Sequence, residues 1–114
     1  MTQHEDRVRL RHMLDYSRKA VAMIEGRTRE DLDRDEMLCL ALTRVVEVIG
    51  EAATRVSQAG QQQHGQIPWP EIIGLRNRLV HGYDSVDLNI LWDIVQQDLP
   101  PLIEQLQAIL GGSQ

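Results

Sequence analysis

The sequence predicts an all-α fold, in which four or five helices form an up-and-down bundle within a single domain spanning residues 1–114. A length of 114 residues is typical of one domain. Hydrophobic residues recur at three- and four-residue spacing, and no segment shows the alternation typical of a strand. The chain contains no Phe, two Trp and two Tyr, so its core must come from aliphatic residues and Met, which favours packed helices over sheets.

The first helix is expected to run from about His4 to Glu25. It is marked by one apolar stripe, formed by Leu10, Met13, Leu14, Ser17, Val21 and Ile24. Gly26 follows as a stop signal. Residues 27–35 are dense in charge, so we expect a connecting loop there.

A second helix is expected from about Asp35 to Ala59, where a wide apolar stripe extends onto other faces. A helix this apolar around its circumference belongs at the centre of the fold or in an interface between subunits. Gly50 in its middle lowers helix propensity but lets another helix approach closely. A loop rich in Gln and Gly should follow over residues 60–66.

The third helix should begin within residues 67–71, because Pro70 suits a first helical turn. It should end at Gly82, and a short turn over residues 84–87 should follow.

The last helical segment is expected over residues 88–110, with Asp87 as its N-cap. Pro100 and Pro101 should break or kink it, because proline removes a backbone donor. Residues 1–3 and 111–114 should be frayed.

Composition excludes several classes of protein. The single cysteine, Cys39, excludes an internal disulfide and a zinc site built from cysteines. No metal motif or cofactor motif stands out, and neither group is expected. No apolar run approaches the length of a membrane span, and the N-terminus has no apolar targeting segment, so the cytoplasm is the simplest location.

The formal net charge of −5 argues against a protein that coats nucleic acid, because non-specific affinity comes from phosphate neutralisation. The charge is uneven, however, since residues 1–30 hold seven basic and five acidic side chains. Eleven of the twelve basic residues are Arg, whose planar guanidinium fits phosphates and carboxylates. A local Arg site could therefore still act on nucleic acid.

Residues 76–83 form the most unusual segment, with two Arg, an Asn, a His and a Tyr. His81 is the best candidate for a general acid–base, and Arg76 can hold a phosphate and stabilise charge that develops on it. Together they suit transesterification of RNA, in which the 2′-hydroxyl attacks its own phosphodiester without a metal. On an unbroken helix the two residues lie ~140° apart, so the helix must unwind near Gly82 for them to share a face.

A purely structural interpretation also remains open. His81 and Tyr83 could cap the helix end while Arg76 pairs with Glu47 or Glu51, which are four residues apart and share a helical face. Either carboxylate could equally position Arg76 for catalysis.

The segment over residues 67–83 is similar to a known family. Residues 67–77 read Ile-Pro-Trp-Pro-Glu-Ile-Ile-Gly-Leu-Arg-Asn, and residues 79–83 read Leu-Val-His-Gly-Tyr. This string resembles the HepT family of HEPN-domain toxins. Further pieces match in order, at residues 48–53, 86–87, 92–95 and 98–102, so the resemblance covers nearly the whole chain.

The resemblance implies an all-α bundle that forms a homodimer, with two copies of the motif in a cleft at the interface. Family members carry an Arg, then four to six residues, then a His, which here match Arg76 and His81. The polar residue after the Arg matches Asn77. The pattern implies a metal-independent endoribonuclease of a toxin–antitoxin pair, acting on RNA such as tRNA or mRNA.

The resemblance also implies a partner, a nucleotidyltransferase-fold antitoxin of the MntA type. In the family this antitoxin transfers AMP from ATP onto the motif Tyr, which is Tyr83 here. An AMP at that position would place negative charge and bulk beside His81, compete for Arg76 and block an RNA phosphate.

The site residues then have distinct expected roles. His81 acts as general acid–base, Arg76 stabilises the pentavalent phosphate, and Asn77 orients the phosphate or the His. Glu51 holds the catalytic Arg. Arg78 either contacts RNA or faces solvent.

A second function from a different class stays open. The chain could be a non-catalytic accessory subunit of a nucleotidyltransferase, with residues 76–83 as a docking surface. A structural dimer without a ligand is disfavoured by that polar segment.

Overall fold

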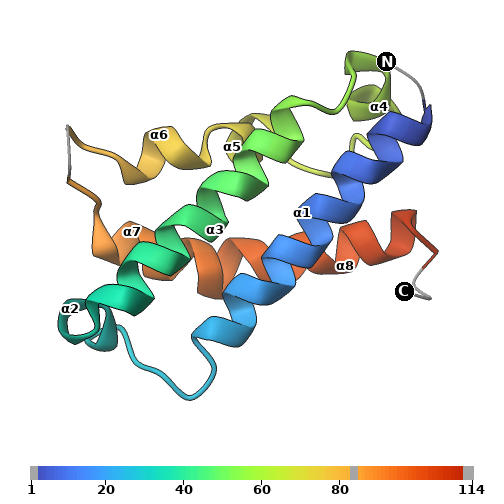
Figure 1. Cartoon of the computed structure of the whole chain (residues 1–114). Coiled ribbons are helices and arrows are strands. Elements are labelled where there is room, and N and C mark those ends of the chain that lie inside the picture. The colour runs from blue at the N-terminus through green and yellow to red at the C-terminus, as the bar shows by residue number, and fades with distance from the viewer. Residues whose placement is uncertain (1–2, 83–84, 112–114) are drawn as a thin grey trace.

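The computed structural model describes residues 3–82 and 85–111, and within them the predicted all-α fold is confirmed. The order of elements is α1 (Gln3–Met23), α2 (Asp31–Arg34), α3 (Glu36–Thr54), α4 (Gln58–Gln63), α5 (Trp69–Ile73), α6 (Leu75–Leu79), α7 (Leu88–Asp93), the π-helical turn η1 (Ile94–Asp98) and α8 (Leu99–Ile109). The long helices α1 and α3 lie side by side and antiparallel, and α7, η1 and α8 cross behind them (Figure 1). Buried aliphatic side chains from these layers form one core.

Two short helices replace parts of the expected loops. Helix α2 lies within residues 27–35, where the backbone N–H of Thr28 donates to the Asp31 carboxylate at 2.8 Å and Leu32 is buried. Local hydrogen bonds and one buried anchor are enough for a single helical turn, and neither gives an apolar periodicity. Helix α3 then begins at Glu36, because the Asp35 side chain accepts from the N–H of Leu38 at 3.0 Å.

Helix α3 ends at Thr54, five residues before the predicted end. The cause is a contact from far away in the sequence: the N–H of Ser57 donates to the Asp6 carboxylate of α1 at 2.8 Å. The Ser57 hydroxyl in turn accepts from the N–H of Gly60 and caps α4.

The predicted third helix is divided at Gly74 into α5 and α6, and α6 ends at Leu79 rather than at Gly82. Beyond it Val80 is extended and forms an isolated antiparallel bridge with Val86. Helix α5 lies close on α3, since a Cβ at Gly50 would be 3.2 Å from the carbonyl oxygen of Ile72. The expectation that Gly50 permits a close approach is thereby confirmed.

The last segment shows the predicted cap and the predicted break. The Asp87 side chain accepts from the N–H of Ile90 at 3.0 Å and caps α7. The break precedes the prolines: η1 closes with a bond from the N–H of Leu99 to the carbonyl of Ile94, and Pro100 and Pro101 fall in the first turn of α8. A first turn needs no N–H from these positions, so the helix continues after the widened turn.

No helix in the described part of the chain has both the length and the apolar character that crossing a membrane requires.

Candidate active site

Helix α6 presents the polar motif by anchoring its opposite side in the core. Leu75 and Leu79, four residues apart, are completely buried, whereas Arg76, Asn77 and Arg78 are exposed. Beyond α6 the chain reverses direction, because Val80 and Val86 form an antiparallel bridge. The polar motif side chains that the structure describes, Arg76, Asn77, Arg78 and His81, are therefore open to solvent.

Arg76 lies against α3 and meets Glu47. Its Nε is 3.6 Å from Glu47 Oε2, and its side chain remains 64% exposed. The expectation that Glu51 holds Arg76 is wrong, because Glu51 accepts from Arg44 Nη1 at 3.1 Å instead. Glu47 and Glu51 are one turn apart along α3, about 6 Å, and α6 lies against the turn that carries Glu47.

Arg44 joins the two carboxylates into a small network. Its Nη1 is also 3.5 Å from Glu47 Oε1. The hydrogen bond and charge of Glu51, with a smaller contribution from Glu47, raise the pKa of Arg44 above its ordinary value. Arg44 thus stays charged and satisfies Glu51, which leaves one oxygen of Glu47 for Arg76.

His81 lies just past the helix, on the bridged segment. Its backbone N–H donates to the carbonyl of Ser85 at 2.9 Å, and its ring is 53% exposed. The helical end that must unwind near Gly82 does so from Val80 onward, and Gly82 has a φ of +133°. The sequence requires such an unwinding before Arg76 and His81 can lie on one face.

Asp87 is a neighbour of His81 that sequence reasoning identified only as a helix cap. One carboxylate oxygen caps α7, and the other, Oδ2, is 3.9 Å from His81 Nε2. The backbone N–H of Asp87 also donates to the carbonyl of Leu79, at 2.9 Å. Asp87 therefore ties the end of α6, the His81 segment and the start of α7 together.

Arg78 points to a different partner from Arg76. Its Nη1 is 2.6 Å from Asp98 Oδ2 at the end of η1, and both side chains are partly exposed. The sequence offered RNA contact or solvent exposure for Arg78, and the structure shows that it forms an ion pair. Tyr83 lies outside the described residues.

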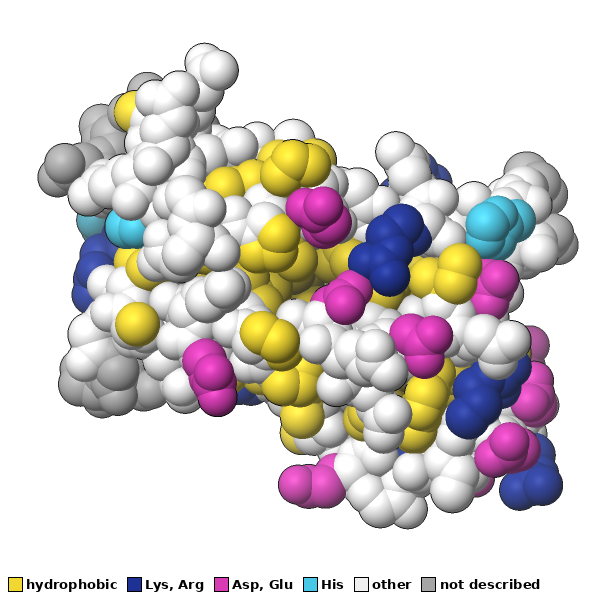
Figure 2. Space-filling model, turned by 180° about the vertical axis from the view of Figure 1, so that it is seen from behind, with side chains coloured by type: hydrophobic (Ala, Val, Ile, Leu, Met, Phe, Trp, Pro, Cys, Tyr) yellow, Lys and Arg dark blue, Asp and Glu magenta, His cyan; other side chains and the backbone are white. Residues whose placement is uncertain are grey.

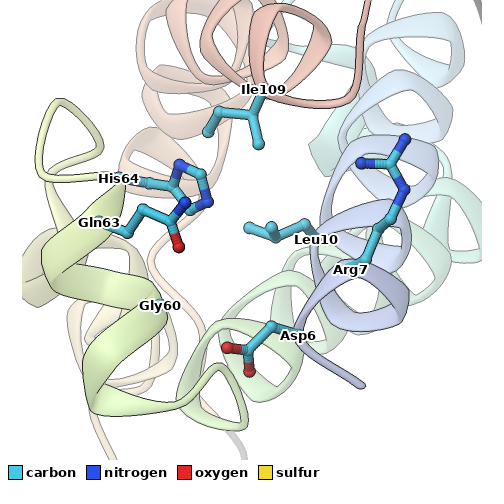
Figure 3. Close-up of a pocket in the computed structure, with 7 residues that line it drawn as sticks. All are labelled: Asp6, Arg7, Leu10, Gly60, Gln63, His64 and Ile109. Atoms are coloured by element: carbon cyan, nitrogen blue, oxygen red, sulfur yellow. The ribbon is translucent and has the colours of Figure 1, made fainter. Parts of the chain in front are cut away.

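Among the hollows lined by described residues, one adjoins the candidate site and another lies away from it. A hollow of about 410 Å³ adjoins Arg78, between α5, α6, η1 and α8. Another, of about 250 Å³, lies between α1, α4 and α8 at the other end of the molecule, where Asp6, Arg7 and His64 line it (Figure 3). Asp6 accepts hydrogen bonds from Ser57, so this second cavity lies where α4 packs against α1. Within the described residues no three side chains of metal-binding type gather closely enough to hold an ion.

Comparison with known proteins identifies the family to which the sequence belongs. The sequence model described as "Ribonuclease HepT-like" matches residues 13–109. The chain belongs to the HepT-like ribonuclease family. The match includes α6, His81 and Asp87, and it confirms the resemblance seen in the sequence.

Several HepT-like relatives are similar over most of their length. A protein named "Putative RNase TTE0752", from Caldanaerobacter subterraneus subsp. tengcongensis, is 33% identical over 89% of this chain and 90% of its own. "Probable ribonuclease HepT" of Thermococcus cleftensis is 36% identical over 74% of this chain and 80% of its own. "Putative RNase MJ1380" of Methanocaldococcus jannaschii is 33% identical over 70% and 78%. No solved structure matches the chain significantly.

The side chains of this candidate site are of types that can carry out acid–base and phosphate chemistry. A half-exposed imidazole beside a carboxylate can accept and return a proton. An exposed guanidinium can bind a phosphodiester and offset charge that develops on it. Both groups lie on a segment open to solvent, where a large substrate can reach them.

Proposed function

We propose that this chain is a metal-independent endoribonuclease that cleaves RNA by transesterification, with Arg76 and His81 in the catalytic roles. One observation carries the proposal: helix α6 ends at Leu79, so His81 lies on an exposed segment beside Asp87. Relatives of the chain carry names that describe ribonucleases, which supports RNA as the substrate class.

The reaction needs one proton removed and one supplied. His81 takes the proton of the 2′-hydroxyl, and O2′ attacks the adjacent phosphorus. The bond from phosphorus to O5′ breaks, and the imidazolium form of His81 gives a proton to O5′ as it leaves. The products are a 2′,3′-cyclic phosphate and a 5′-hydroxyl. Arg76 stabilises the charge of the pentavalent phosphate, and the exposed Asn77 orients it.

A homodimer would supply two such motifs around one RNA phosphate, as the family resemblance implies. Helix α3 supports this proposal because it leaves large apolar side chains in solvent: Met37 is 81% exposed and Leu40 is 64% exposed. The mass of the protein in solution, measured by light scattering, tests it. A monomer at assay concentrations contradicts it.

Control by AMP transfer is the second part of the proposal. Tyr83 follows His81 by two residues in the sequence, and the described neighbours Gly82 and Ser85 are both exposed. A nucleotidyltransferase-fold antitoxin of the MntA type would join the α-phosphate of ATP to the Tyr83 oxygen and release pyrophosphate. Mass spectrometry after incubation with ATP and such an enzyme should show added AMP on the parent protein and none on Tyr83→Phe.

The nuclease itself is tested with protein expressed without any nucleotidyltransferase and checked by mass for an unmodified Tyr83. Total tRNA and a messenger RNA are incubated in EDTA with the parent, His81→Ala and Arg76→Ala. His4→Ala and Arg34→Ala serve as matched controls, since both lie away from the motif. Cleavage that only the two motif variants lose supports the proposal. Folded parent protein without activity favours the accessory-subunit alternative.

A further inference from the structure

A hollow of about 190 Å³ between α1 and α3 is lined by three basic side chains. Arg9 and His12 line it from α1, and Arg55 lines it from the C-terminal end of α3. Val48 and Ala52 of α3 form the apolar part of its lining. Basic groups from two helices thus converge on one small surface, although the whole chain has a formal net charge of −5.

The three basic side chains lack acidic partners. Within residues 3–82 and 85–111, none of them forms an ion pair or a side-chain hydrogen bond, and Arg9 Nε has no acceptor. Glu51 also lines the hollow, but it accepts from Arg44 Nη1 at 3.1 Å. The positive charges around the hollow therefore repel one another without a counter-ion, so a bound anion would be stabilised there.

The hollow lies along the same side of α3 as the proposed catalytic arginine. Glu47, Glu51 and Arg55 follow one another at four-residue spacing, which places them along one side of the helix. Glu47 meets Arg76, and Arg55 lies about 12 Å further along the helix axis. Arg44 and Arg76 balance the charges of the two glutamates. A negatively charged strand that passes from Arg76 to the hollow therefore meets no excess of acidic charge.

The opposite face of the molecule has a different charge pattern. Seen from behind α1 and α3, acidic side chains lie beside most of the basic ones (Figure 2). Arg78, for example, pairs with Asp98 at 2.6 Å. The hollow between α1 and α3 is therefore better suited to a phosphate than that face is.

We propose that this hollow binds a backbone phosphate of the RNA substrate, a few nucleotides away from the cleaved bond. This inference rests on the proposed ribonuclease function. Guanidinium groups donate several N–H groups to phosphate oxygens, and such contacts position a strand without reading its bases. Arg9 and Arg55 supply the charge, and His12 supplies a further N–H donor. A strand held here is aligned along α3 with another of its phosphates at Arg76.

Binding of uncleavable RNA tests the inference independently of catalysis. A fluorescent single-stranded 2′-O-methyl RNA is titrated with the parent, with Arg55→Gln and with the double variant Arg9→Gln/Arg55→Gln at several salt concentrations. We expect about threefold to tenfold weaker binding for Arg55→Gln and a further loss for the double variant. The log–log salt dependence should become shallower by about 0.7, the value for one phosphate of a single strand.

Matched variants keep this test specific. Arg34→Gln removes an exposed arginine from α2, away from the hollow, and should bind RNA like the parent. Arg55 is exposed, so Arg55→Gln tests the site even where the double variant does not fold.

Cleavage of two substrates tests where the phosphate site lies relative to the cleaved bond. A dinucleotide has a single phosphodiester and cannot reach from Arg76 to the hollow, so the parent and Arg55→Gln should cleave it at equal rates. For a longer single-stranded RNA, Arg55→Gln should raise KM about threefold to tenfold and leave kcat unchanged.

The outcomes separate this inference from the function on which it rests. Binding that depends on Arg55 in a protein that cleaves no RNA supports the phosphate site and contradicts the proposed function. Cleavage with unchanged RNA binding in both hollow variants, or an equal loss of binding in Arg34→Gln, overturns the inference. Inorganic phosphate that binds the parent and is not displaced by RNA would assign the hollow to a free anion and overturn it. A changed mass of Arg55→Gln in light scattering, with RNA binding intact, would assign the hollow to a second copy of the chain and also overturn it.

Discussion

Arg76 and Glu47 meet across the contact between α6 and α3, with Nε and Oε2 3.6 Å apart. Glu47 is only 20% exposed, whereas Arg76 is 64% exposed, so the fixed partner is the carboxylate. Glu51, one turn further along α3, is occupied by Arg44. The position of α6 on α3 thus selects one carboxylate of two for the proposed catalytic arginine.

Replacing Glu47 should therefore affect activity, and replacing Glu51 should not. For Glu47→Gln we expect turnover of RNA to fall about threefold to tenfold, because Arg76 loses the charge that orients it. Stability should change by less than about 1 kcal/mol, since Arg76 is 64% exposed and water screens its ion pair with Glu47. Steady-state cleavage rates and urea unfolding measure the two effects. The opposite ranking, with Glu51→Gln the slower enzyme, would contradict this assignment.

Asp87 should show separable effects on stability and on activity. Asp87→Ala removes the cap of α7 and should cost about 1 kcal/mol in the free energy of unfolding. Asp87→Asn keeps a good cap, so its stability should stay close to that of the parent. Both variants lose the carboxylate that lies 3.9 Å from His81 Nε2, and both should cleave RNA more slowly. A fully active Asp87→Asn protein would show that this carboxylate serves α7 alone.

Gly82 should be needed for the conformation of the segment that carries His81. Its φ of +133° is rarely adopted by residues with a side chain, so Gly82→Ala should cost about 1–3 kcal/mol or shift the segment. Nothing lies within 4 Å of the added Cβ, so the effect comes from the backbone. Gly26→Ala is a matched control, because Gly26 has a φ of +73°, equally open space and no contact with the motif. Both variants should lower stability in urea, and Gly82→Ala alone should lower activity.

Asp35 should contribute to stability in a pH-dependent way. The backbone N–H of Leu38 and, more weakly, Arg27 lower the pKa of its carboxyl below the ordinary value of 3.8. A carboxyl with a lowered pKa in the folded state stabilises the protein above its unfolded value, and the contribution is lost as pH falls through the folded value. Asp35→Asn keeps a helix cap without a charge, so its stability should fall less steeply than that of the parent below pH 3.8. Parallel curves for the two proteins in acid urea titrations would refute this.

The long helices could be predicted from the sequence because their periodicity is a local signal. Helices α1, α3 and α8 carry apolar stripes over several turns, and their burial decides their conformation. The short helix α4 could not be predicted in the same way. It begins where it does because Ser57 bonds to Asp6, a residue 51 positions away.

The candidate site shows the same division. The exposed motif residues of α6 follow from the buried spacing of Leu75 and Leu79, which a sequence pattern reveals. The partners of these motif residues cannot be predicted from that spacing. They depend on how α6 crosses α3 and on where the chain reverses after Val80. For that reason the sequence favoured Glu51 over Glu47 and contained no sign that Asp87 lies near His81.

The most direct measurement of the central claim is the chemistry of the cleaved ends. The unmodified protein is incubated in EDTA with a defined RNA and with the same sequence carrying 2′-O-methyl groups, and products are analysed by mass. The account predicts 2′,3′-cyclic phosphate and 5′-hydroxyl ends from the RNA, no product from the methylated strand, and no cleavage by His81→Ala. Products with 3′-hydroxyl ends, or cleavage of the methylated strand, would contradict it, because neither reaction uses the 2′-hydroxyl as nucleophile.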